Sequence, residues 1–144
     1  MNVLNLRIGD WQMLNTDAKF VREQVFILEQ QIPAADEWDA MDEQAIHFVL
    51  FDTDQAIATA RLLPDHHIGR VAVLKSHRGL GVGADLMRKV MDYADQQQHP
   101  FLALSAQVYA TAFYEQLGFQ RYGEEYLDCG IPHMMMHLKL SDLD

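Results

Sequence analysis

The sequence predicts a single domain of the mixed α/β or α+β class over residues 1–144. Its 144 residues are 49% hydrophobic, which is enough to bury one sizeable core and stays within the usual size of one domain. Runs with strand spacing alternate with runs of helical spacing, in the order βαββ and then βαβαββ. No repeat of roughly 20 to 50 residues and no low-complexity linker separates them, so the elements are expected to form one unit.

Four elements are expected in the first half of the chain: a strand at 3–8, a helix from Asp17, and strands at 46–52 and 55–64. In the first strand Val3 is out of phase with Leu4, as in a half-buried strand. Asp17 is a suitable N-cap, and the helical spacing of apolar residues ends before Pro33. The turn-forming residues 52–54 predict that the second and third strands form a hairpin.

Six elements are expected in the second half: a strand at 67–74, a helix from Val82, a strand at 101–108, a short helix at 110–117, a strand from Phe119 and a strand at 133–140. The polar residues 96–100 end the long helix, and Gly118 closes the short one at its C-terminal side. A turn at 130–132 is expected to join the last two strands.

The net charge of the chain narrows the range of expected binding partners. The chain has 21 acidic and 11 basic residues and a formal charge of −10, so its average field repels a phosphate backbone and nucleic acid is not expected to bind. No apolar run approaches the roughly 20 residues needed to span a bilayer, and the first residues lack the pattern of a signal peptide. Cys129, the lone cysteine, cannot form an internal disulfide. A cytoplasmic protein is expected.

Acidic residues gather in the segment 36–43, where they surround Trp38 and Met41. Two interpretations are open: a solvated loop with these two residues folded back on the core, or an acidic rim that attracts a cationic substrate. Arg22 and Arg61 offer a similar choice, because they can pair with the surplus acids or bind a carboxylate on a substrate.

Three glycines at alternate positions, Gly79, Gly81 and Gly83, precede the long helix. Such a loop lets backbone N–H groups and the helix dipole approach an anion closely, so a phosphate is the expected ligand. A Walker loop is excluded because no Gly-Lys pair occurs. Gly79, Gly81 and Ala84 satisfy a dinucleotide fingerprint, but the strand at 101–108 lacks the acidic residue that would hold a ribose. A glycine turn that serves only tight packing is a third interpretation.

Here the sequence resembles the GNAT family of acyltransferases. Residues 78–83 match its R/Q-x-x-G-x-G/A pyrophosphate loop at all three specified positions, between a V-x-V strand and an amphipathic helix. Residues 110–119 match its A-x-x-F-Y-x-x-L-G-F segment in the right order and spacing. The runs 25–30, 60–62 and 130–133 are similar to the ElaA-like branch, so the resemblance extends over nearly the whole chain.

The resemblance implies a mostly antiparallel central sheet flanked by helices and splayed at the coenzyme site. It also implies that acetyl-CoA is the cosubstrate. The splay is expected in the fifth strand, at Val71, Ala72 and Val73, whose backbone would hold the pantetheine and polarise the thioester. Tyr114 is the matching position for the acid that protonates the leaving thiolate, although on helical spacing alone it could be part of an apolar stripe. The coenzyme-binding residues so implied are Val71, Ala72, Val73, Arg78, Gly79, Leu80, Gly81, Val82, Gly83 and Gln107. Gln107 stands where many members have Asn, a departure that the ElaA-like branch shares.

The sequence does not identify the base that an attacking ammonium requires. Glu29, His47 and His133 are candidates for the base or for the acceptor site, and each also has a structural interpretation. No metal is expected, because His133 and His137 lie in a strand pattern and His66-His67 lacks further ligands.

The predicted activity is direct transfer of an acetyl group from acetyl-CoA to an amine. A non-catalytic acyl-CoA sensor and a nucleotide-dependent oxidoreductase are the alternatives. Polyamine, amino-sugar, peptide-terminus and small metabolite amines are all open as acceptors. The acyl chain length and the assembly state are also open, with a homodimer as one option.

Overall fold

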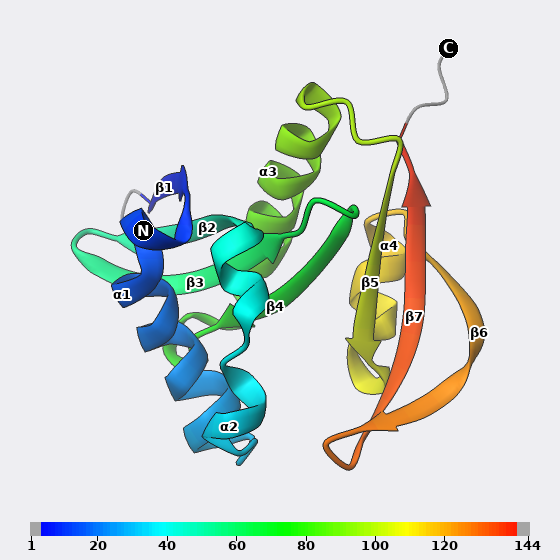
Figure 1. The fold of residues 1–144 in the computed structure, drawn as a ribbon, viewed down its shortest axis with the longest axis horizontal. Helices are drawn as coiled ribbons and strands as arrows, with labels where there is room; N and C mark the ends of the chain where they lie inside the picture. The colour runs from blue at the N-terminus through cyan, green and yellow to red at the C-terminus, as the bar shows by residue number, and fades with distance from the viewer. Residues whose placement is uncertain (1–3, 141–144) are drawn as a thin grey trace.

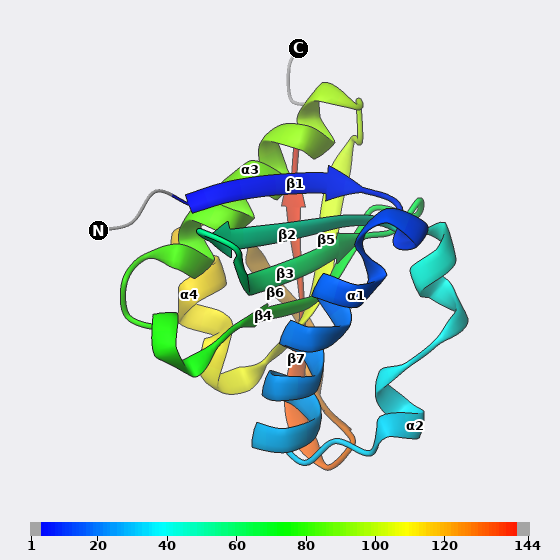
Figure 2. The same cartoon turned by 90° about the vertical axis from the view of Figure 1, so that its left-hand side faces the viewer.

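The computed structural model describes residues 4–140, which form one seven-stranded sheet with helices packed on both faces (Figures 1 and 2). The strands are β1 (Leu4–Gly9), β2 (Ile46–Asp52), β3 (Gln55–Leu62), β4 (His67–Val73), β5 (Phe101–Gln107), β6 (Gln120–Asp128) and β7 (Ile131–Lys139). The α-helices are α1 (Trp11–Arg22), α2 (Ala34–Glu37), α3 (Val82–Gln96) and α4 (Thr111–Gln116). A π-helical turn, η1 (Glu23–Glu29), continues α1, and three short 3-10 turns are η2 (Ala40–Gln44), η3 (Lys75–His77) and η4 (Val108–Ala110).

The strand order is β1-β2-β3-β4-β5-β7-β6, and β4 with β5 is the one parallel pair of neighbours among the described strands. The predicted mixed, mostly antiparallel sheet is therefore confirmed, as is the order of its elements. Val3, with which the first strand was expected to begin, lies outside the described residues.

The sheet divides between β4 and β5. These strands pair at two positions, His67 with Ala103 and Ile68 with Leu104, and then diverge toward their carboxyl ends. Figure 1 shows the widening gap between the two ribbons. The splayed strand is the fourth in the chain, so its expected number, fifth, was wrong, but the splay lies beside the residues that the resemblance implied.

A β-bulge lies in β4 at the point of divergence. The register between β3 and β4 shifts between Thr59 and Arg61, so that Arg70 and Val71 together face Ala60. Arg70 has φ of 52°, a left-handed conformation that is uncommon for a residue with a Cβ. The bulge bends β4 away from β5, where the two strands cease to pair.

Some element boundaries differ from the expected ones. Asp10, not Asp17, caps the first helix: its Oδ1 accepts a hydrogen bond of 2.9 Å from the Met13 N–H. The last hairpin turns at Cys129 and Gly130, with φ of 52° and 77°, so the turn expected at 130–132 begins one residue earlier. Gly118 ends α4 as predicted, with φ of 105° and its N–H bonded to the Glu115 carbonyl.

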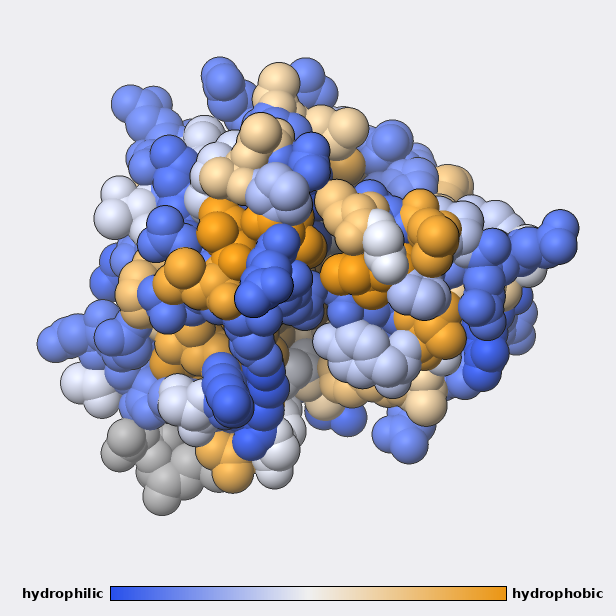
Figure 3. Space-filling view, turned by 90° about the horizontal axis from the view of Figure 1, so that it is seen from below, coloured by the Kyte–Doolittle hydropathy of each residue, from blue (hydrophilic) through white to orange (hydrophobic). Residues whose placement is uncertain are grey.

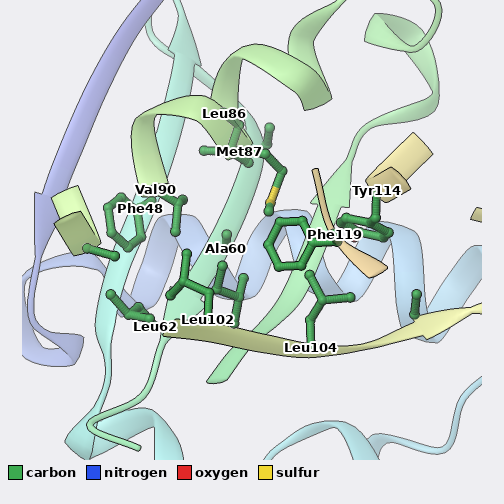
Figure 4. Packing of buried hydrophobic residues seen from close by; sticks show 14 of the residues in the cluster. Phe48, Ala60, Leu62, Leu86, Met87, Val90, Leu102, Leu104, Tyr114 and Phe119 are labelled. Atoms are coloured by element: carbon green, nitrogen blue, oxygen red, sulfur yellow. The ribbon is translucent and has the colours of Figure 1, made fainter. Parts of the chain in front are cut away.

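Two apolar clusters fix the sheet between its helices. The larger joins α3 and α4 to β2, β3 and β5, and Figure 4 shows Leu86 and Val90 packed toward Phe48 and Leu102. The smaller joins α1 and η1 to the opposite face, where the alternate residue Val49 points. Each large side chain buried in these clusters stabilises the folded state by about 1.5 to 3 kcal/mol by leaving water.

The acidic segment 36–43 is folded into a buried network of ion pairs. Arg22 is 1% exposed and donates to Glu37 and Asp42, both at 2.8 Å. Arg61 donates to Asp39 at 2.8 Å and to Asp42 at 2.9 Å. Burial raises the pKa of the Glu37 carboxyl, against the opposing pull of its arginine partners.

This network corrects the picture of the segment as a solvated loop, and it removes Glu37 and Asp42 from any acidic rim. Glu37 and Asp42 are buried, and arginines occupy their carboxylates, so they are not available to a substrate. The interpretation in which Arg22 and Arg61 pair with the surplus acids is confirmed. Trp38 is half-buried beneath the Arg22 guanidinium, whereas Met41 is exposed instead of folded back on the core.

Candidate active site

The glycine loop brings the N-terminus of α3 to the open end of the splay. Gly81 is the N-cap of α3 with φ of 81°, a conformation that glycine adopts without strain, and Gly79 has φ of 77°. A Cβ at either position would meet no atom within 4 Å, so the backbone angle and not crowding accounts for glycine there. The first N–H groups of a helix lack partners within the helix, so this end can bind an anion.

A hollow of about 350 Å³ adjoins this loop. It is lined by Leu4, Asp52, Ser76, His77, Leu80, Gly81, Val82 and Asp85. A second hollow, of about 370 Å³, lies between η1 and the end of β4 and is lined by Phe20, Gln24, Val25, Leu28, Glu29, Leu74, Lys75 and Ser76. The loop residues Leu80, Gly81 and Val82 therefore face open space.

Arg78, in the glycine loop, forms a bidentate ion pair with Glu29 at the end of η1. The Arg78 Nη atoms donate to the Glu29 carboxylate at 2.5 and 2.6 Å, and its Nε donates to the Val73 carbonyl at 2.9 Å. These hydrogen bonds lower the pKa of Glu29 and raise that of Arg78. Glu29, a candidate base, is thus held as a carboxylate beside a cation, which makes it a weak acceptor for a substrate proton.

The open backbone of the splay is at Val71, Ala72 and Val73, where β4 has no pairing with β5 among the described residues. The side chains of Val71 and Val73 pack against the larger cluster, while Ala72 packs against the smaller one. Gln107, at the end of β5, donates a hydrogen bond of 2.8 Å from Nε2 to Oε1 of Gln30, which follows η1. This bond crosses the open end of the splay.

Tyr114 lies on α4 with its ring in the larger apolar cluster. The ring contacts Phe113 and Phe119 at centroid distances of 5.0 and 6.1 Å, and the residue is 9% exposed. Burial raises the pKa of its phenol, so the hydroxyl stays protonated at neutral pH. No described residue hydrogen-bonds that hydroxyl, so it is free to donate to a ligand. The same cluster contains Val82 of α3 and borders Val71.

The two candidate histidines have different surroundings. His47 is 1% exposed on β2, with Nε2 2.9 Å from the Asp42 carbonyl and its ring 4.7 Å from that of Trp11. Burial lowers its pKa. It belongs to the buried ion-pair region, two strands away from the splay. His133 lies on β7 directly opposite Gln107 of β5, beside the splay.

Several residues of this region carried no sequence signal. The left-handed Arg70 depends on the register of β3 and β4, which a single sequence does not reveal. Gln30 was visible only as part of the run 25–30, and its bond to Gln107 joins residues 77 positions apart. Among residues 4–140 no three metal-binding side chains gather into a site, and no helix is long and apolar enough to cross a membrane.

Comparison with known proteins identifies the class that this fold and loop define. Residues 16–140 match the family model described as "Acetyltransferase (GNAT) domain". The chain therefore belongs to the GNAT acetyltransferase family. Within it, the chain falls in the ElaA-like branch: Escherichia coli ElaA superposes with a TM-score of 0.86 at 27% identity, over 95% of this chain and 100% of that one.

Other relatives agree with this placement. YjcF of Bacillus subtilis, an uncharacterized N-acetyltransferase, is 37% identical over 83% of this chain and 89% of its own length. A putative N-acetyltransferase from Lactobacillus plantarum superposes with a TM-score of 0.89 at 30% identity, over 96% of this chain and 99% of that one. A Pseudomonas aeruginosa structure described as an acyl-CoA N-acyltransferase has a TM-score of 0.85 at 28% identity, over 94% and 99%. The chain is thus similar throughout its length to acyltransferases.

Proposed function

We propose that this protein transfers an acetyl group from acetyl-CoA directly to a primary amine. The observation that carries the proposal is the splay between β4 and β5, which pair at two positions and then diverge. It opens toward a helix N-terminus suited to phosphates and borders the apolar cluster that holds the protonated Tyr114. A long, thin donor with a pyrophosphate at one end and a thioester at the other has the shape and charge distribution that this arrangement can hold.

The donor would be held by backbone groups. Its pyrophosphate would lie at residues 78–83, where the N–H groups of the first turn of α3 and the helix dipole favour negative charge. Its pantetheine would run along residues 71–73, whose amides are free of β5, with Gln107 on the opposite side. An N–H beside the β4 bulge would stabilise the oxyanion formed from the thioester carbonyl.

Transfer then needs three proton movements. The acceptor ammonium first loses a proton to a base, and its nitrogen attacks the carbonyl carbon, so that a C–N bond forms as the C–S bond breaks. The Tyr114 hydroxyl gives its proton to the leaving thiolate and regains one from solvent, and the nitrogen loses its second proton to solvent as the amide forms. The net reaction converts ammonium and thioester into amide, thiol and one released proton. No metal is invoked, and we place the activity in the cytoplasm.

Ligand-induced stabilisation and turnover test the proposal together. Acetyl-CoA at a hundredfold excess over its dissociation constant should stabilise the native state by about 2.7 kcal/mol, whereas NAD should leave the melting temperature unchanged. A panel of polyamine, amino-sugar, peptide and small metabolite amines, assayed for free thiol release, would identify the acceptor. Stabilisation without thiol release for any amine would favour the acyl-CoA sensor, and no stabilisation at millimolar acetyl-CoA would contradict the proposal.

A further inference from the structure

One face of the β5-β7-β6 part of the sheet is left open by the helices. The residues Leu104 and Met136 point to the face that α4 covers, because they belong to its buried cluster. Strand alternation then directs Ser105, Gln107 and His133 to the opposite face. Seen from the end toward which β5 runs, apolar residues lie on both sides of a band of hydrophilic ones (Figure 3). The pair Gln107 and His133 lies at the end of this face where β5 no longer pairs with β4.

His133 on this face is held in one tautomer. Its Nδ1 lies 2.7 Å from the Ile131 carbonyl oxygen, and because a carbonyl can only accept, Nδ1 carries the hydrogen. In the neutral ring Nε2 is therefore the nitrogen with a free lone pair. The ring stacks on Tyr126 at 5.9 Å and 27°, which fixes its orientation. Within residues 4–140 no other group hydrogen-bonds Nε2.

The other two candidates do not combine these properties. The Glu29 carboxylate is engaged by both Nη atoms of Arg78, and this pairing lowers its pKa. His47 is enclosed in the buried ion-pair region and uses Nε2 on the Asp42 carbonyl. Of the three candidates, His133 is the one whose basic nitrogen makes no hydrogen bond, and its partner Gln107 lies on β5 beyond the point where β4 and β5 stop pairing.

The charges around this face favour a cation. The hairpin of β6 and β7 carries Glu124, Glu125 and Asp128, all exposed. Its tip meets the acidic segment, where the Cys129 Sγ lies 3.8 Å from an Asp36 carboxylate oxygen. Asp36 is exposed, unlike Glu37. An acceptor that approaches over the hairpin therefore passes exposed carboxylates before it reaches His133.

We propose that His133 is the general base and that the acceptor is a cationic primary amine which binds on this open face. The inference rests on the proposed function. Nε2 takes a proton from the acceptor ammonium and becomes imidazolium, which leaves the amine nitrogen with the lone pair that attacks the thioester. The proton passes from His133 to solvent after transfer.

His133→Asn tests the assignment, because the amide still donates to the Ile131 carbonyl but offers no basic nitrogen. His137→Asn is the matched control: His137 lies on the same strand and the same face, and its ring packs on Tyr122 at 4.7 Å as that of His133 packs on Tyr126. We expect His133→Asn to lower kcat/KM for a cationic amine by about 10² or more. It should leave acetyl-CoA affinity within about twofold, and His137→Asn should change neither.

The pH profile separates a base from a structural residue. The acidic limb of kcat/KM should disappear in His133→Asn and persist in His137→Asn. Among the described residues, the titratable side chain that contacts His133 is Tyr126 on β6, and β5 presents Ser105 and Gln107 on this face. The fall in kcat/KM caused by His133→Asn should also be smaller for an acceptor whose ammonium pKa is below the assay pH. Such an amine is already deprotonated and needs no base.

The outcomes distinguish the two proposals. An unchanged rate and pH profile in His133→Asn, with an active parent protein, would overturn the assignment of the base and leave the acyltransferase function in place. If amines whose other groups are neutral or anionic were turned over faster than cationic amines, the proposed class of acceptor would be overturned. A parent protein that binds acetyl-CoA but acetylates no amine would overturn both the inference and the proposed function.

Discussion

Arg70 joins the bulge of β4 to the buried acidic segment, with its Nε 3.1 Å from Oε2 of Glu37. Its Nη2 lies 3.1 Å from Oδ2 of Asp39 and 3.0 Å from the Glu37 carbonyl oxygen. The side chain that makes these contacts belongs to a residue with φ of 52°. The ion pairs therefore offset a strained backbone beside the proposed thioester site.

Two substitutions at Arg70 separate the side chain from the backbone. Arg70→Ala and Arg70→Gly both remove the ion pairs, but only glycine adopts the left-handed conformation without strain. We expect Arg70→Gly to be the more stable of the two by about 1 kcal/mol, measured by urea unfolding. Equal stabilities would mean that the bulge relaxes when the arginine is lost.

Gly81→Glu should abolish acetyl-CoA binding while the protein remains folded, because a side chain there occupies the space before the α3 N–H groups. Gly123→Glu is the matched control, since Gly123 has φ of 79° and equally open surroundings but lies on β6. Both substitutions carry the same backbone strain, so calorimetric titration isolates the ligand effect. Normal binding by a folded Gly81→Glu protein would place the phosphates elsewhere.

Tyr114→Phe removes only the hydroxyl and keeps the ring between Phe113 and Phe119. Turnover should fall by roughly 10 to 10³, less than a full general-acid contribution because water can partly replace the phenol. Coenzyme affinity should hold, the pattern of an interaction made mainly in the transition state. Tyr93→Phe, on α3 against the same cluster, should not alter turnover. If chemistry limits the rate, a change within about twofold would leave Tyr114 a core residue only.

Asp39 should make folding stability depend on pH in the acid range. Its hydrogen bonds from Arg61 lower its pKa in the folded state, below an unfolded value of about 3.9. The stabilisation is therefore present above the unfolded pKa and is lost as pH falls through the folded one. We expect the difference in free energy of unfolding between the parent and Asp39→Asn, measured with urea from about pH 3 to 6, to become smaller as the pH falls. A constant difference would show that the carboxylate is not stabilised by its partner.

The strands and the long helix could be predicted because local spacing decides them: Val82, Leu86 and Val90 recur on one helical face and are all buried. The start of the first helix was missed because its cap precedes the buried Leu14, a turn before the stretch where the apolar spacing is dense. The loop motif at 78–83 could be found because the close approach of a backbone to phosphate restricts residue type strongly.

Pairing of Arg22 and Arg61 with acidic residues was predicted, and His133 was a candidate base, but the sequence could not show which carboxylates are paired or which His133 nitrogen makes no hydrogen bond. The partners of Glu37 and Asp42 come from α1, β3 and β4, and nothing in the order of charges along the chain selects them. The basic nitrogen of His133 depends on where one carbonyl falls when β7 turns out of its hairpin. Such properties arise when distant segments meet, so only the folded chain reveals them.

The short pairing between β4 and β5 has a consequence for the stability of the protein if the proposed donor binds beside it. β4 and β5 pair there at two positions, and Gln107 at the end of β5 is hydrogen-bonded to Gln30, which follows η1. Under the proposed function, a donor bound along β4 would connect the two parts of the sheet through its amide groups. Since ligand binding stabilises the native state by mass action, cells poor in acetyl-CoA would hold a looser and more readily degraded population of this protein.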